Sequence, residues 1–261
     1  MEGQKLLPIC RFLVVLLGIF FIPSPAKAQV YESRQFTPLV ELFTSEGCSS
    51  CPPAENWMFQ IGKNQSLFKT FNAIEFHVDY WDYLGWKDPF SHKLFSKRQR
   101  DYVRQKYMDS VATPTVLVQG KAFYGWRRQQ PLPKAKQASL PIKVVQNGDQ
   151  FKVSVILPKS DKRQLLAHGS YLSRQLTSKV SHGENAGRTL NHDLIALSLS
   201  TKPLQSSKDG WQTVLNLKEN RVAPHVKQRA FVIWISEAGR QMPLQSIGAM
   251  LPQKSTRKSL K

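Results

Sequence analysis

Residues 38–54 read PLVELFTSEGCSSCPPA, an apolar run followed closely by two cysteines and two prolines. The run predicts a buried strand, and residues 52–63 read as a helix. Proline is tolerated in the first turn of this helix, because the N–H groups there have no partner within the helix. The cysteines therefore stand at a helix N-terminus, where the helix dipole and the free N–H groups lower a thiol pKa. This position suits an outer thiol that attacks as thiolate and a second thiol that closes a disulfide without moving the backbone.

A second motif, Thr113-Pro114-Thr115, opens another apolar run further along the chain. Between the two motifs, residues 71–80 predict a strand and residues 91–107 a helix with one apolar face. Residues 115–118 and 121–124 predict two strands joined by a hairpin turn. The order strand, helix, strand, helix, strand, strand is that of the thioredoxin core. The first half of the chain therefore predicts an α/β thioredoxin-like domain over residues 37–128.

The second half has a different pattern. Residues 129–140 are polar and contain prolines, which is typical of a linker. No stretch with helical periodicity follows, whereas apolar residues alternate with polar ones in short segments, as in half-buried strands. The sequence predicts an antiparallel β-sandwich-like domain over residues 141–251 and a basic tail over 252–261. The predicted strands of this domain are 142–145, 151–157, 165–171, 194–199, 211–217 and 231–235.

The N-terminus predicts a signal peptide over residues 1–28. Lys5 and Arg11 precede and border an apolar run over 12–22, and Ala26-Lys27-Ala28 is a small-x-small cleavage site. The run is shorter than the roughly 20 residues of a membrane span, although an uncleaved anchor is the alternative. We therefore expect an exported protein, periplasmic or secreted, that is cleaved after Ala28. Cleavage removes Cys10 and leaves Cys48 and Cys51 as the mature cysteines.

The net charge of the chain indicates which classes of binding partner to expect. The formal net charge of the chain is +19, and its basic residues are dispersed. Because we expect the protein to be exported, nucleic acid is not expected as its partner. The positive charge fits either a solvated basic surface or attraction to anionic surfaces of the cell envelope.

Several segments together resemble an exported family, domain of unknown function 1223. The cysteine segment is the most specific of them, and the segments are 40–54, 76–82, 85–90, 113–115 and 183–190. The resemblance implies a thioredoxin-like fold and export, but no substrate. The chain departs from ordinary thioredoxins in having Gly47 before the first cysteine and Pro52-Pro53 after the second, and these departures bear on the redox potential and the choice of partner more than on the fold.

The cysteine pair leaves three interpretations open. In the first, Cys48 lies nearest solvent and attacks a client disulfide, or accepts a client thiol when oxidised, and Cys51 resolves the mixed disulfide. Thr113 and Pro114 would then dock the backbone of the client as an added strand. The partners would be client protein thiols or disulfides and an unidentified redox partner.

In the second interpretation the Cys48–Cys51 disulfide is structural and fixes a loop. In the third, Cys48, Cys51 and His77 bind or deliver copper or zinc. Glu46 and Glu55 would oppose thiolate formation if they lie near the sulfurs, and the two serines between the cysteines carry no cation. We therefore expect a weakly oxidising pair.

Two further polar features have open roles. His77 and Asp79 share a face of the predicted strand, so they could carry protons for Cys51 or serve only in packing. The polar stretch 181–193 is either a structural loop or a contact with the cysteine half or a partner. No histidine follows Cys51 and no glycine-rich phosphate loop is present, so no cofactor is predicted.

Overall fold

The computed structural model describes residues 28–134, 137–158, 160–208, 210–218 and 228–252. The predicted signal peptide up to residue 27 and the predicted basic tail after residue 252 lie outside the described residues. Of the described residues, 42% lie in strands and 15% in helices. No helix within these ranges is long and apolar enough to cross a membrane.

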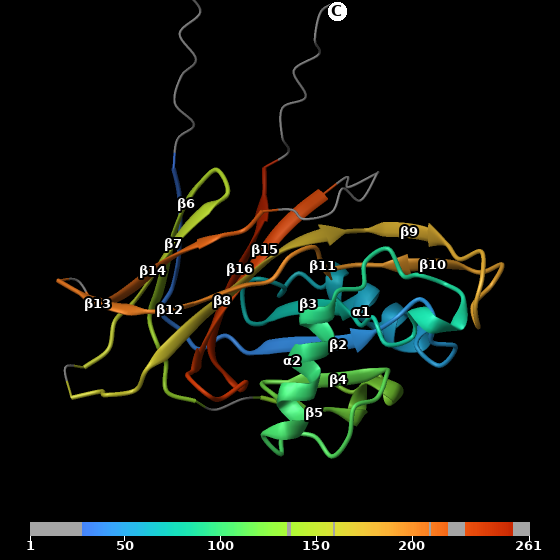
Figure 1. The fold of residues 1–261 in the computed structure, drawn as a ribbon. Helices are drawn as coiled ribbons and strands as arrows, with labels where there is room; N and C mark the ends of the chain where they lie inside the picture. Colours follow the sequence, from blue (N-terminus) through green and yellow to red (C-terminus); the bar gives the residue numbers. More distant parts are fainter. Residues whose placement is uncertain (1–27, 135–136, 159, 209, 219–227, 253–261) are drawn as a thin grey trace, which may run out of the picture.

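Most strands belong to one large sheet. Its strands are β2 (Leu39–Thr44), β3 (Asn72–His77), β4 (Thr115–Val118), β5 (Lys121–Ala122), β8 (Leu165–Arg174), β11 (Ile195–Ala196), β12 (Ser200–Pro203), β15 (Gln228–Glu237) and β16 (Pro243–Leu251). Their order is β16-β15-β8-β11-β3-β2-β4-β5, and β12 also pairs with β8. Strands from both halves of the chain thus form one nine-stranded layer (Figure 1).

The other strands form a five-stranded sheet and a two-stranded ribbon. The five-stranded sheet has the order β1-β6-β7-β14-β13 and the ribbon pairs β9 with β10. The strands are β1 (Gln29–Ser33), β6 (Ile142–Asn147), β7 (Gln150–Val155), β9 (Leu176–Lys179), β10 (Thr189–His192), β13 (Gln205–Ser207) and β14 (Gly210–Asn216). The helices are α1 (Pro52–Lys63), α2 (Lys93–Arg104) and the single-turn 3-10 segments η1 (Asp82–Leu84) and η2 (Tyr124–Arg128).

The predicted fold class, an α/β thioredoxin-like N-terminal domain followed by a separate β-sandwich-like domain, is wrong. The structure is mostly β-sheet, and β3 pairs in parallel with β2 on one side and with β11 on the other. Strand β11 in turn pairs with β8, which leads on to β15 and β16. Local periodicity identifies a strand and its buried face, but it carries no information about which distant strand lies beside it.

Strand β15 shows how one sheet serves two cores. Ala230, Val232 and Trp234 belong to the core that includes β2, β3 and the two α-helices. The alternate residues Phe231, Ile233 and Ile235 belong to the core facing the five-stranded sheet. Both faces of this strand are therefore covered, which explains its continuous apolar run.

The two α-helices pack on opposite faces of β2. Glu41 faces α2, where its carboxylate accepts a hydrogen bond from Nε of Arg98 at 2.7 Å. Thr44 faces α1 and donates its hydroxyl to Glu55 at 2.7 Å. Because successive strand residues alternate between faces, residues 41 and 44 point to opposite sides. The end of β2 thus delivers the cysteine loop to the side on which α1 begins.

The local predictions of elements were largely correct. Helix α1 has the predicted bounds, and β4 spans the predicted 115–118. The structure shortens the predicted strand 71–80 to β3 and the predicted helix 91–107 to α2. The strands that the sequence analysis missed are β1, β9, β10, β12, β13 and β16. The proposed division into 37–128, 129–140 and 141–251 concerns independent folding and stays a prediction.

Candidate functional site

The site is built around a disulfide between Cys48 and Cys51, with a Cα–Cα distance of 5.4 Å. Cys51 is the N-cap of α1, and its carbonyl accepts hydrogen bonds from the N–H groups of Ala54 and Glu55 at 2.9 and 3.2 Å. Both cysteines have 0% exposure, whereas Ser49 and Ser50 between them are exposed. The expectation that Cys48 lies nearest solvent is therefore wrong for the disulfide form, because neighbouring segments cover it.

One covering segment comes from the second half of the chain. The carboxylate of Glu184 accepts the backbone N–H of Ser49 at 2.9 Å, and this hydrogen bond lowers the pKa of Glu184. The side-chain amide of Asn185 donates to the carbonyls of Glu46 and Cys48, both at 2.9 Å. Of the two readings of the 181–193 stretch, contact with the cysteine half is thus confirmed. Its C-terminal part forms β10.

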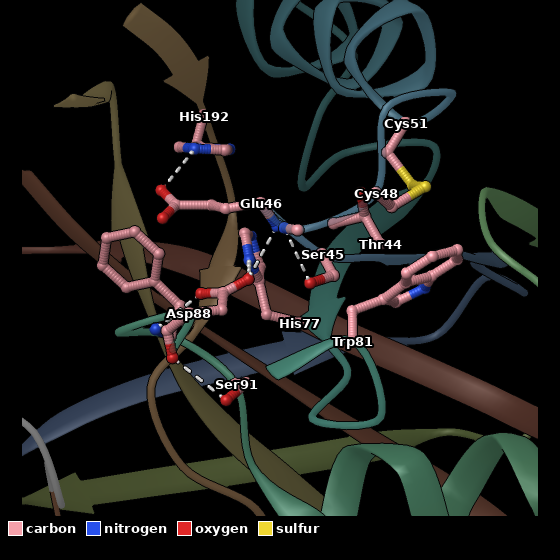
Figure 2. Close-up of polar contacts among 12 residues, drawn as sticks. Thr44, Ser45, Glu46, Cys48, Cys51, His77, Trp81, Asp88, Ser91 and His192 are labelled. Atoms are coloured by element: carbon pink, nitrogen blue, oxygen red, sulfur yellow. Dashed lines mark hydrogen bonds and ion pairs between the residues drawn. A yellow bond between two sulfur atoms is a disulfide. The ribbon is translucent and has the colours of Figure 1, made fainter. Parts of the chain in front are cut away.

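A tryptophan packs against the residue before the first cysteine. A Cβ atom at Gly47 would lie 3.1 Å from Cβ of Trp81, so a larger residue there would displace the tryptophan. The Trp81 indole donates to the hydroxyl of Thr113 at 2.7 Å. Figure 2 shows Trp81 beside the disulfide loop. Gly47 therefore allows Trp81 to connect the cysteine loop with the Thr113-Pro114 segment.

The Thr113–Pro114 segment lies at a cavity next to the cysteine loop. The peptide bond between these residues is cis. Thr113 and Pro114 line a cavity of about 590 Å³ together with Ser50 and Pro53 of the cysteine loop and helix α1. The two predicted motifs, far apart in the sequence, are therefore brought to one hollow of the surface. Its lining also includes Lys106, Tyr107, Phe123, Tyr124, Trp126 and Arg127.

A buried group of acidic and histidine side chains, which we call the Glu–His cluster, lies behind the disulfide loop. Its members, all buried, are Glu46, Glu55, Glu75, His77, Asp88 and His192. Glu75 and His77 come from β3, His192 ends β10, Glu55 lies in α1, and Glu46 and Asp88 lie in loops. Figure 2 shows His192 beside Glu46 and His77 beside Asp88.

The histidine rings are held at short distances from carboxylates. His77 Nδ1 lies 2.7 Å from Asp88 Oδ2 and His77 Nε2 lies 2.8 Å from Glu75 Oε1. His192 Nε2 lies 3.2 Å from Glu46 Oε1. Glu46 also accepts the Trp86 indole N–H at 2.8 Å and the Ser178 hydroxyl. Asp88 accepts the backbone N–H groups of Glu46 and Phe90, both at 2.8 Å.

Burial and mutual charge shift the pKa values in this cluster. Burial lowers the pKa of His192, but the carboxylates of Glu55, Glu46 and Glu75 outweigh it and raise the pKa to about 10. Burial raises the pKa of Glu55 to about 7, although His192 opposes the shift. Against the opposing effect of burial, the histidines hold the pKa of Glu75 and of Asp88 below the usual range. These shifts favour a protonated His192 beside ionised Glu75 and Asp88.

The structure separates some residues that the sequence analysis had grouped. His77 turns to Glu75 and Asp88, whereas the backbone N–H and carboxylate of Asp79 bond to the hydroxyl of Ser96. The two cysteines are bonded to each other, and the ring nitrogens of His77 face Asp88 and Glu75 rather than the sulfurs. Cys48, Cys51 and His77 thus do not form a common donor set in this structure.

The sequence analysis missed Glu75 and Asp88 as site residues, and it noted His192 only as part of a polar stretch. A signal for Glu75 was present, because a carboxylate and a histidine two apart in the apolar segment 72–78 share one face of a buried strand. Asp88 and His192 had no such signal, since only the tertiary fold brings them to β3.

Two solved structures share the fold. Protein AGR_C_4864 from Agrobacterium tumefaciens matches with a TM-score of 0.54 and 24% identity, covering 86% of this chain and 98% of that chain. HBP35 of Porphyromonas gingivalis matches with a TM-score of 0.54 and 14% identity, covering 84% of this chain and 76% of that one. No curated protein matches the sequence. The family described as "Protein of unknown function (DUF1223)" matches residues 39–236, and the chain belongs to this family.

Proposed function

We propose that the protein is an exported thiol–disulfide oxidoreductase, or a redox-dependent accessory protein, that works through Cys48 and Cys51. The observation that supports this proposal is the position of the disulfide at the start of α1, beside the cavity lined by Ser50, Thr113 and Pro114. Closing so short a loop stabilises a fold by about 2 kcal/mol at most. The two apolar cores make such a staple unnecessary, so redox chemistry is the better explanation of the bond.

In the proposed exchange, the thiolate of Cys48 attacks one sulfur of a client disulfide and the other client sulfur leaves as a thiolate. Cys51 then attacks the Cys48 sulfur of the mixed disulfide, which releases the reduced client and closes the Cys48–Cys51 bond. The reverse sequence oxidises a client dithiol. An unidentified redox partner restores the starting state in either direction.

The cavity is the proposed docking site for the client. Thr113 and Pro114 line one part of it, and exposed Ser50 lies on the cysteine side. Aromatic residues with Lys106 and Arg127 in the lining suit an extended segment with apolar and acidic side chains. Because both sulfurs are buried, exchange requires that the 181–188 segment, which is hydrogen-bonded to the cysteine loop, shifts away.

The charges near the cysteines favour the disulfide over the dithiol. Glu46 and Glu55 lie two and four residues from the nearest cysteine, and no cation occurs between Cys48 and Cys51. A thiolate there is stabilised by the helix N-terminus but opposed by carboxylates. A poorly stabilised thiolate makes the disulfide a weak oxidant and the dithiol a good reductant. We therefore infer that the pair donates electrons more readily than it accepts them.

Ellman's reagent tests the proposal on the reduced mature chain. In the wild type, Cys48 attacks the reagent and Cys51 displaces the second thionitrobenzoate, so the disulfide reforms without a lasting adduct. Cys51→Ser should stop at a stable adduct on Cys48, and Cys48→Ser should react much more slowly.

A structural disulfide would behave differently. Its thiols would react quickly only after denaturation, and both single variants would react at similar rates. Either result would contradict the proposal. Circular dichroism of each variant supplies the control for folding.

A further inference from the structure

The Glu–His cluster contains polar atoms that have no partner although they are fully buried. These atoms are Oε2 of Glu55, Oε2 of Glu75 and Nδ1 of His192. Nδ1 of His192 lies 3.3 Å from Oε1 of Glu75 and 3.9 Å from Oε2 of Glu55, without the alignment of a hydrogen bond. Leaving a buried polar atom unpaired is unfavourable, so these three atoms within one buried cluster indicate a missing partner.

Glu75 and His192 also lie close to a second imidazole, that of His77. Within the part of the chain that the structure describes, Glu75, His77 and His192 each offer a ligand atom, and these atoms lie within 4.8 Å of one another. Donor atoms around a tetrahedral zinc ion, with bonds of about 2.0–2.1 Å, stand about 3.3 Å apart. The distance between Glu75 and His192 already has this value.

Each histidine is also oriented as a metal ligand would be. His77 directs Nε2 inward and holds Nδ1 against Asp88, and His192 directs Nδ1 inward and holds Nε2 against Glu46. Metal-binding histidines commonly carry such a carboxylate on the ring nitrogen away from the ion, because it fixes the orientation of the ring. Asp88 and Glu46 are themselves held by further donors, as described above.

The charge balance of the cluster fits a cation. Across the described residues, the ion pairs of Glu46, Glu55, Glu75 and Asp88 are all with histidine. Four carboxylates thus face two imidazoles in an interior without Lys or Arg as their partners. Isolated buried carboxylates are strongly unfavourable unless they are paired or coordinate a metal.

We propose that Glu75, His77 and His192 bind one divalent transition-metal ion, with Glu55 as the fourth donor and with Asp88 and Glu46 holding the two rings. Imidazole and carboxylate donors without sulfur suit Zn²⁺, with Mn²⁺ or Fe²⁺ as weaker competitors. The site does not rest on the proposed thiol chemistry, because neither cysteine is a donor. Since it is buried, the ion would enter as the chain folds.

Zinc alone is the probe for this proposal. The full mature chain, with its disulfide intact, is refolded with Zn²⁺, freed of loose metal by gel filtration, and analysed by elemental mass spectrometry. One zinc per chain is expected. Glu75→Gln and His192→Gln should weaken zinc binding by at least about 100-fold, and Asp88→Asn by about 10–100-fold. If Glu75→Gln does not fold, Glu55→Gln is the substitute variant, because it removes the proposed fourth donor.

Two controls separate this site from others. His168 is a buried histidine hydrogen-bonded to Thr201 and Ser236, so His168→Gln should keep full zinc content. The double variant Cys48→Ser with Cys51→Ser should also keep it. Bound Co²⁺ should show visible bands without the near-ultraviolet charge transfer of a thiolate ligand.

The proposal is overturned if the folded wild type holds no stoichiometric zinc, in which case the cluster is a proton-sharing group only. It is equally overturned if the cysteine variant loses the metal while Glu75→Gln retains it. Failure of the thiol assay with intact zinc binding would refute the redox proposal alone.

Discussion

The interior between the five-stranded sheet and β8–β15 and the interior behind the Cys48–Cys51 disulfide are equally buried but chemically opposite. The first is filled by residues such as Phe151, Val153, Phe231 and Ile233. The second holds the Glu–His cluster, with four carboxylates and two histidines. Apolar burial stabilises a fold in proportion to its area, whereas buried charge costs free energy unless it is fully compensated.

The two interiors therefore differ in what they contribute to the stability of the fold. The two apolar cores stabilise the fold by burial, whereas replacing buried ionic groups by apolar ones often stabilises a protein. The Glu–His cluster is therefore a costly arrangement for stability, and the proposed metal ion would compensate this cost.

The largest expected effect comes from deleting the chain after residue 140, which removes most strands of the second half. A fragment of residues 29–140 lacks β8, β11 and β15, so β3 loses β11, one of its two partner strands, and the core beside the helices loses Leu172, Val232 and Trp234. We expect no cooperative unfolding transition for this fragment by circular dichroism in urea, in contrast to the full mature chain. A cooperative transition would instead show that residues 37–128 fold as the independent domain that the sequence predicted.

A single core substitution should weaken the whole molecule. Phe231→Ala removes a fully buried ring from the core that faces the five-stranded sheet, and it should lower the free energy of unfolding by about 3–5 kcal/mol. Urea denaturation measures this loss, and Ile156→Ala, at a side chain that is 65% exposed, is the control with little change. Thiol reactivity of the folded Phe231→Ala protein should equal that of the wild type. An altered rate would mean that the two interiors are coupled.

A substitution in the 181–188 segment, which is hydrogen-bonded to the cysteine loop, should affect mainly the disulfide. Asn185→Ala removes the side-chain donor to the Glu46 carbonyl and one of two donors to the Cys48 carbonyl, which keeps the N–H of Cys51, so we expect about 1–3 kcal/mol of destabilisation. It should also speed reduction of the disulfide by dithiothreitol, because the 181–188 segment is released. The matched control is Asn191→Ala at an exposed position of β10. Unchanged reduction kinetics for Asn185→Ala would show that this segment does not limit access.

The smallest effect is expected from Glu184→Gln. The variant removes one negative charge at Ser49 N–H, so the reduced protein should show a rate of Cys48 alkylation raised a few-fold at neutral pH. The folded pKa of Glu184 lies below its ordinary 4.5, so its contribution to stability is full above that value and is lost as the pH falls through the folded pKa. A difference in stability between variant and wild type that persists below that pH would contradict the assignment.

Local structure and the cysteine motif could be predicted from the sequence to a large extent. The apolar run before Cys48, the prolines after Cys51 and the hairpin at Gln119-Gly120 each depend on neighbours along the chain, and the structure has β2, α1 and the β4–β5 hairpin there. The pairing of Cys48 with Cys51 belongs to the same class, because two residues separate them. The fold class failed, since it assumed that each half of the chain closes its own sheet.

Local sequence sufficed for the two α-helices, for most strands of the large sheet and for the place of the thiols at the start of a helix. Only the tertiary structure decided that β3 pairs with β11, that β15 faces two cores, and that His192 and Asp88 meet Glu75 and His77. The physical reason is the separation along the chain of the residues that are in contact. Helix starts, turns and alternation arise from contacts within a few residues. The pairing of β3 with β11 and the approach of His192 to Glu75 instead join segments more than a hundred residues apart, and the packing of the whole chain chooses them.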